Sequence, residues 1–123
     1  MEFSRLTGFS VENIQCNRVE YAERFSREYN CTLVLKGHNT VIASPNNETV
    51  INKTGNSALS KGGSGDVLAG VIGSLLAQGY SPHTAAVIGA YVHGKAGEIL
   101  SSVYGCSVVI PSDLPKVIGK LLG

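Results

Sequence analysis

A run of glycines followed directly by an aspartate is the part of this chain whose residue types could carry out chemistry. Gly62, Gly63 and Gly65 lie just before an apolar pattern typical of a helix, and Asp66 falls in its expected first turn. Glycine lets the backbone approach a ligand closely, and the first turn of a helix has unpaired N–H groups, so the arrangement favours binding of a phosphate. A carboxylate beside that phosphate could act as a general base toward an attacking hydroxyl.

The spacing of these residues excludes two other phosphate motifs and leaves one structural alternative. A Walker A loop needs lysine after its last glycine, whereas Lys61 precedes Gly62. A dinucleotide fingerprint starting at Gly63 would need glycine or alanine at Leu68 and a strand directly before it. A tight loop in which Asp66 only caps a helix is compatible with the same residues.

The downstream segments that must position this loop are predicted to be helices. The apolar residues after Asp66 recur at helical spacing, and Gly79 is expected to end that helix. Ser81 and Pro82 are typical of the next helix start, which we expect to run to about Ser101. Small residues on this second helix predict close packing against a neighbour; they are Ala85, Ala86, Gly89, Ala90, Gly94 and Gly97. His93 lies on the same stripe and is expected to be a packing histidine rather than a catalyst.

Upstream of the loop, the pattern predicts mixed helices and strands. Residues Asn17–Tyr29 have one apolar face, with Asn30 as the expected stop. The aliphatic run Thr32–Lys36 predicts a strand buried on both faces, as in a βαβ unit. Turn residues between Thr40–Ala43 and Thr49–Ile51 predict a hairpin. The remaining expectations are a helical turn at Glu2–Leu6, an N-cap at Ser10, a strand or linker at Ser107–Ile110, and a last helix from Pro111 to Leu122 capped by Ser112 or Asp113.

The composition favours a folded domain and argues against a nucleic-acid-binding or membrane-spanning protein. The 123 residues, 43% of them hydrophobic and 15% charged, suffice for a folded domain with one modest core. A net charge of +1 without a basic stripe argues against nucleic-acid binding, and no apolar run reaches the ~18 residues of a membrane span. Cys16, Cys31 and Cys106 lack the spacing of a zinc site or disulfide framework and favour a reducing cytoplasm.

Residues 52–70 resemble the signature of the NAD(P)H-hydrate dehydratases, a branch of the ribokinase-like superfamily. That signature reads Asn-x-x-Gly-Asn-x-x-Leu-Ala-x-Gly-Gly-Ser/Thr-Gly-Asp-x-Leu-x-Gly, and this sequence departs from it at Ser60, where alanine is usual. The matching residues are Asn52, Gly55, Asn56, Leu59, Gly62, Gly63, Ser64, Gly65, Asp66, Leu68 and Gly70.

Three further segments carry the resemblance over nearly the whole chain. Leu35–Thr40 is similar to the family's Lys-Gly-x-x-Thr nucleotide segment, and Tyr91–Gly97 to its second helix. Glu2–Leu6 resembles the end of its His-Pro-Gly-Glu-x-x-Arg-Leu motif, but the histidine before that glutamate is absent here. The resemblance therefore implies an α/β fold in which residues 1–123 form the C-terminal portion of a ribokinase-like three-layer α/β/α domain, with the N-terminal half missing.

The resemblance implies an enzyme that repairs hydrated NADH or NADPH. ADP or ATP phosphorylates the ring hydroxyl, and loss of phosphate restores the double bond. Asp66 is the implied catalytic base and substrate contact. Mg²⁺ is expected on phosphate and water, with no protein side chain as a metal ligand. The implied nucleotide-binding residues are Lys36, Gly37, His38, Asn39, Thr40, Asn56, Gly63, Ser64 and Gly65.

Two alternatives to this activity stay open. A ribokinase-like kinase acting on another small molecule would share the glycine loop and the base at Asp66. A catalytically silent nucleotide-binding fragment is the second alternative, because half of the family's domain is absent. Half of such a domain would expose a strand edge and an apolar face, so we also expect self-association into a homo-oligomer.

Overall fold

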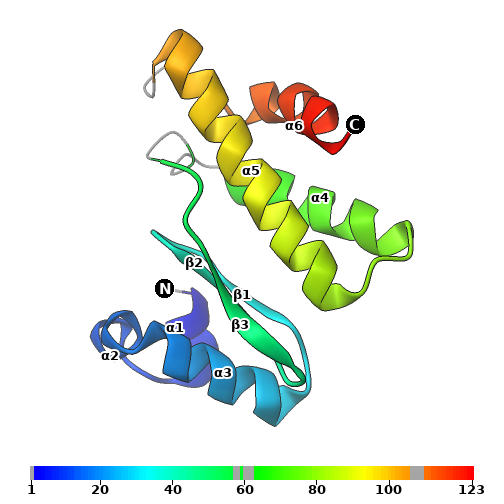
Figure 1. The fold of residues 1–123 in the computed structure, drawn as a ribbon. Helices are drawn as coiled ribbons and strands as arrows, with labels where there is room; N and C mark the ends of the chain where they lie inside the picture. Colours follow the sequence, from blue (N-terminus) through cyan, green and yellow to red (C-terminus); the bar gives the residue numbers. More distant parts are fainter. Residues whose placement is uncertain (1, 57–58, 60–62, 106–109) are drawn as a thin grey trace. The chain divides into compact units, whose positions relative to one another are not determined.

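The computed structural model describes residues 2–56, 59, 63–105 and 110–123 (Figure 1). Within them the chain divides into two compact units, Met1–Ile51 and Asn52–Gly123, and each is described by itself. Lys61, Gly62, Cys106 and most of the expected strand or linker at Ser107–Ile110 lie outside the described residues.

The first unit contains three helices followed by three strands. Their bounds are α1 Glu2–Thr7, α2 Val11–Cys16, α3 Arg18–Tyr29, β1 Leu33–Leu35, β2 Thr40–Ser44 and β3 Asn47–Asn52. Ser10 caps α2 as predicted, because its hydroxyl accepts a hydrogen bond from the N–H of Asn13 at 3.1 Å. Asn30 ends α3 in a left-handed conformation, with φ 50°. These helix predictions are confirmed.

The three strands form one sheet in the order β1-β2-β3. The predicted hairpin of β2 and β3 is confirmed, with β1 antiparallel to β2 so that Leu35 lies opposite Val41. The prediction that β1 is buried on both faces is wrong: only Leu35 is buried, while Leu33 and Val34 are half-buried. Leu33 and Val34 lie on opposite faces of the sheet and both are partly exposed, so neither face of β1 is fully covered. β1 is the edge strand in the order β1-β2-β3, and its described neighbour is the antiparallel strand of the hairpin rather than the parallel strand of a βαβ unit.

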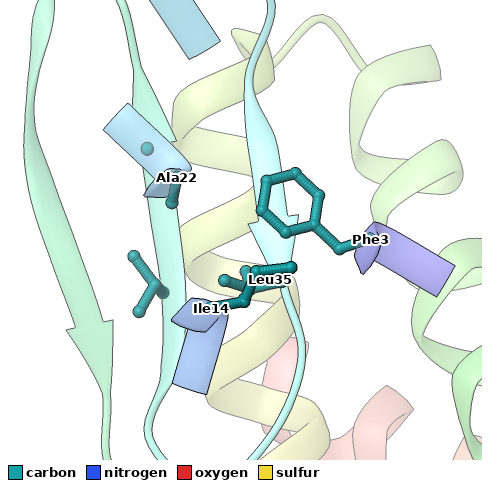
Figure 2. Close-up of a cluster of buried hydrophobic side chains, with 6 residues drawn as sticks. Phe3, Ile14, Ala22 and Leu35 are labelled. Atoms are coloured by element: carbon teal, nitrogen blue, oxygen red, sulfur yellow. The ribbon is translucent and has the colours of Figure 1, made fainter. Parts of the chain in front are cut away.

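A hydrophobic cluster joins the helices of this unit to its sheet (Figure 2). It consists of Phe3, Ile14, Ala22, Leu35, Val41 and Ala43. Phe3 also meets Phe25 of α3 edge-on, with ring centroids 5.3 Å apart. Burial of these side chains fixes α3 against β1 and β2, and with them the turn that joins the two strands.

The second unit is helical in its described residues. The bounds are α4 Ser64–Ala77, α5 Pro82–Tyr104, a single 3₁₀ turn η2 Pro111–Asp113, and α6 Leu114–Leu122. The predicted helices are confirmed, although α4 begins at Ser64, ahead of Asp66. Ser81 caps α5 through the N–H of Thr84, at 3.3 Å. Asp113, one of the two expected caps, is the N-cap residue of α6 but forms no side-chain cap there; its carboxylate instead accepts from the N–H of Ile110 at 3.2 Å.

The small residues of α5 allow its neighbours to approach closely, as the sequence predicts. A Cβ atom added to Gly89 would lie 2.7 Å from Ile72 of α4, and one added to Gly97 would lie 2.8 Å from Leu59. A hydrophobic cluster of α5 and α6 completes the packing; its members are Val92, Ala96, Leu100, Leu114 and Ile118. Each unit thus has its own cluster, where the chain length predicts a single core. In the described part of the chain, no helix combines the length and hydropathy that crossing a membrane requires.

Candidate phosphate-binding site

The N-terminus of α4 presents backbone N–H groups that the helix itself leaves unpaired. Gly63 is its N-cap residue and adopts a left-handed conformation with φ 92°. Glycine has no side chain to cap the helix, and no side-chain cap is formed there by the described residues. The N–H of Val67 donates to the carbonyl of Gly63 at 3.2 Å. The N–H groups of Ser64, Gly65 and Asp66 precede it in the first turn and are therefore oriented toward an incoming anion.

Asp66 combines this first-turn position with an exposed side chain. The carboxylate is therefore open to a ligand and lies in the same turn as the free N–H groups. An anion bound there would have hydrogen-bond donors on one side and an acidic group beside it. Transfer of a phosphoryl group to a hydroxyl is the reaction that this arrangement supports.

Ser64 is buried, and it is held by a histidine from α5. The Nε2 atom of His93 lies 3.0 Å from the carbonyl oxygen of Ser64 and 3.2 Å from its hydroxyl. Both residues are almost fully inaccessible, with exposed fractions of 3% for Ser64 and 7% for His93. The expectation that His93 is a buried, hydrogen-bonded packing residue agrees with these contacts, which also connect it to the first residue of α4.

The other end of the glycine loop is tied to the same helix. Asn52 donates from Nδ2 to the carbonyl of Ala90 at 3.1 Å, and the Thr54 hydroxyl lies 3.1 Å from the carbonyl of Tyr91. About two turns further along α5, the Glu98 carboxylate accepts a hydrogen bond from a loop N–H, that of Gly55, at 2.9 Å.

Asn56, an expected nucleotide contact, is also hydrogen-bonded to α5. Its side chain is exposed, and its Oδ1 accepts a hydrogen bond from the Ser101 hydroxyl at 3.2 Å. The structure therefore brings Asn56 and the Gly63–Asp66 segment together in one unit, because both flank a loop whose two ends are fixed to α5.

The other expected nucleotide residues form a tight turn between β1 and β2 in the first unit. Lys36, Gly37 and His38 are exposed, and Asn39 has a left-handed conformation with φ 59°. The hydroxyl of Thr40, the first residue of β2, donates to the carbonyl of Gly37 at 3.2 Å. These five residues are adjacent in space, as their sequence spacing predicts.

Arg18 fixes this turn, although its role is not predicted from the sequence. One guanidinium nitrogen, Nη1, donates to the carbonyls of His38 and Asn39 at 2.5 and 3.1 Å. The other, Nη2, donates to the carbonyl of Leu35 at 2.8 Å. Burial lowers the pKa of Arg18 from its ordinary value, which is far enough above neutrality that the side chain stays charged. In the sequence, Arg18 is one of several charged residues on an amphipathic helix, and no local pattern distinguishes it.

No dedicated metal site is found in the described residues. They contain no group of three or more histidine, cysteine, aspartate or glutamate side chains that could hold a metal ion.

Comparison with solved structures defines the class of fold. A ribokinase-like superfamily protein from Enterococcus faecalis matches this chain with a TM-score of 0.83 and 31% identity, over 99% of this chain and 41% of that one. The ADP/ATP-dependent NAD(P)H-hydrate dehydratase from Bacillus subtilis, co-crystallised with ATP/Mg²⁺, matches with a TM-score of 0.93 and 35% identity, over 98% and 44%. The predicted fold class is confirmed: the chain is a portion of a ribokinase-like α/β domain.

Sequence comparison then identifies the family. The family model for NAD(P)H-hydrate dehydratase matches residues 1–120, and the chain belongs to this family. The bifunctional NAD(P)H-hydrate repair enzyme of Moorella thermoacetica is 43% identical over 113 residues, which is 92% of this chain and 21% of that protein. The ADP-dependent (S)-NAD(P)H-hydrate dehydratase of Neisseria meningitidis is 43% identical over 104 residues, or 85% and 35%. The chain thus spans less than half the length of these relatives.

Proposed function

We propose that this chain supplies the nucleotide-phosphate site and the catalytic base of an enzyme that dehydrates hydrated NADH or NADPH at the expense of ADP or ATP. The observation that carries the proposal is the uncapped N-terminus of α4 with the exposed carboxylate of Asp66 in its first turn. Membership of the dehydratase family supports the choice of substrate. Cys16 and Cys31, both free thiols, fit a reducing cytoplasm as the site of this reaction.

In the proposed reaction, the Asp66 carboxylate accepts the proton of the ring hydroxyl while the hydroxyl oxygen attacks the terminal phosphorus of the nucleotide. The bond between that phosphorus and the bridging oxygen breaks, so ADP becomes AMP, or ATP becomes ADP. The first-turn N–H groups of Ser64 and Gly65 offset the charge that develops on the phosphoryl oxygens. The C–O bond then breaks as phosphate leaves, the neighbouring carbon loses a proton, and the double bond is restored.

The remaining residues bind the nucleotide in this proposal. The Lys36–Thr40 turn contacts the nucleotide, with Lys36 and His38 as its exposed side chains. Asn56, at the start of the loop, contacts the phosphates. Mg²⁺ would serve as a counterion on phosphate oxygens and water, where it would neutralise phosphate charge.

A nucleotide-binding unit without turnover is the second candidate function. The observation that favours it is the span of the chain, which is 21% of the Moorella relative and 44% of the Bacillus one. If the complete site needs the full length of those relatives, this chain has the phosphate contacts but lacks some of the substrate contacts.

Absorbance at the NADH band, followed after adding hydrated NADH and ADP, tests the proposal. The expected result is a rising absorbance with release of phosphate, whereas a small-molecule kinase would leave a stable phosphate ester. In Asp66→Asn we expect calorimetric ADP affinity to stay within about twofold while turnover falls by about 10²–10⁴-fold. Nucleotide binding without turnover in the unmodified chain would establish the second candidate, and absence of both ADP and ATP binding would refute both functions.

A further inference from the structure

The contact between His93 and Ser64 assigns a hydrogen to one ring nitrogen. A carbonyl oxygen can only accept, so the 3.0 Å contact to the Ser64 carbonyl requires Nε2 to carry the hydrogen. The Ser64 hydroxyl, 3.2 Å from the same nitrogen, then acts as a second acceptor. His93 therefore holds both the backbone and the side chain of Ser64 through a single N–H group.

Ser64 is the residue at which such a contact has most effect on the first turn of α4. Gly63 before it has a left-handed backbone, and Gly65 after it has no side chain that could restrain the segment. The peptide planes of this segment carry the N–H groups that face an incoming phosphate. Because Ser64 is buried and bonded to His93 at two atoms, α5 restrains its orientation.

We propose that His93 is a positioning residue for the phosphate-binding amides. It fixes Ser64 before the nucleotide arrives, so the first-turn N–H groups need no reordering on binding. The inference rests on the proposed function for its ligand, but its structural part concerns only α4 and α5. A histidine that merely fills space would contribute to folding and would have no selective effect on the terminal phosphate.

Calorimetric titration of the full chain with ADP and with AMP separates these roles. In His93→Leu we expect ADP to bind about tenfold more weakly, the equivalent of one lost hydrogen bond, and AMP to change by less than about twofold. His93→Gln, whose amide nitrogen can donate to Ser64, should recover most of the ADP affinity. His83→Leu, on the same helix, is the matched control and should leave both affinities unchanged. Equal weakening of ADP and AMP in His93→Leu, without recovery in His93→Gln, would overturn the proposal.

Nuclear magnetic resonance tests the same contact without any nucleotide. The imidazole ¹⁵N shifts of His93 in the unmodified chain should show the tautomer protonated at Nε2, and His93→Gln should keep the amide shifts of Ser64 and Gly65 closer to the unmodified chain than His93→Leu does. A tautomer protonated only at Nδ1 would overturn the proposal even if either variant fails to fold. If the unmodified chain binds neither ADP nor AMP, the proposed function is refuted, whereas these spectra still decide whether His93 positions Ser64.

Discussion

The backbone conformation of Gly63 sets it apart from the glycines inside α4. Its φ of 92° lies in the left-handed region, whereas an added Cβ would meet only ordinary contacts, with Pro111 at 3.4 Å. Gly73 lies within the same helix and has open space around it. A methyl group added at these two positions therefore tests conformation rather than packing.

We predict that Gly63→Ala lowers the free energy of unfolding by about 1–2 kcal/mol, because a left-handed backbone is unfavourable for alanine. Gly73→Ala should raise it by about 0.5–1 kcal/mol, because glycine is the weaker helix former. Urea titration of both variants measures the two values. A Gly63→Ala variant as stable as the unmodified chain would show that this residue is not held in the left-handed conformation.

The role of Arg18 yields a second residue-scale prediction. Its guanidinium donates to three carbonyls of the turn that carries Lys36 and His38, so we expect Arg18→Met to cost about 1.5–3 kcal/mol of stability. The turn should also exchange its amide hydrogens faster. Arg27→Met, an exposed position on the same helix, is the control and should change stability by less than about 1 kcal/mol. Equal effects of the two substitutions would argue against a specific role for Arg18.

Among the elements, α5 connects most of the candidate site. Its backbone carbonyls accept from Asn52 and Thr54, its Glu98 accepts from Gly55, and its His93 holds Ser64. The loop can approach so closely because α5 has glycine where the two meet. The geometry of the loop is thus imposed by a helix that follows it in the sequence.

Gly94→Ala tests this dependence on α5. The added Cβ would overlap the Thr54 hydroxyl and lie 2.6 Å from the Thr54 carbonyl carbon, which is backbone and cannot rotate away. We predict a loss of about 1–3 kcal/mol in stability, together with altered amide shifts for residues 52–56. Thermal unfolding and NMR provide the two measurements, with Gly73→Ala as the matched control. Unchanged loop shifts would show that the loop does not rest on α5.

The elements were largely predictable from the sequence, whereas the contacts between them were not. Periodicity and caps place α3, α4, α5 and α6 to within a few residues, whereas only the start of α2 was predicted, and the glycine–aspartate pattern locates the N-terminus of α4. Arg18 and His93 escaped prediction as positioning residues because their partners lie 17–29 positions away in the sequence. The position of β1 at the edge of the sheet likewise depends on which strands pair with it, and this cannot be predicted from the aliphatic composition of β1.

At the scale of the whole molecule, the described residues leave much apolar surface uncovered. Leu6 and Val103 are about two-thirds exposed, at 68% and 66%. A groove of about 460 Å³ lies beside β1, lined by residues of α1, α2 and β1. The chain spans 44% of the Bacillus relative. In a polypeptide of that relative's length, additional residues would be available to cover the exposed apolar side chains.

We predict that the 123 residues alone are marginally stable and self-associate, because an exposed strand edge and apolar side chains favour pairing. Size-exclusion chromatography with light scattering, over a range of protein concentrations, should show a mass that rises above that of the monomer. A monomer at every concentration, with a sharp and reversible unfolding transition, would contradict this expectation.

In the proposed function, the first turn of α4 binds the terminal phosphate of an adenine nucleotide beside Asp66. An ADP titration followed by ¹H–¹⁵N NMR measures this binding residue by residue. We predict that the amides of Ser64, Gly65 and Asp66 shift on binding, and that adenosine, which lacks phosphate, leaves them in place. Binding of ADP with no change at these three amides, or the same changes with adenosine, would contradict it.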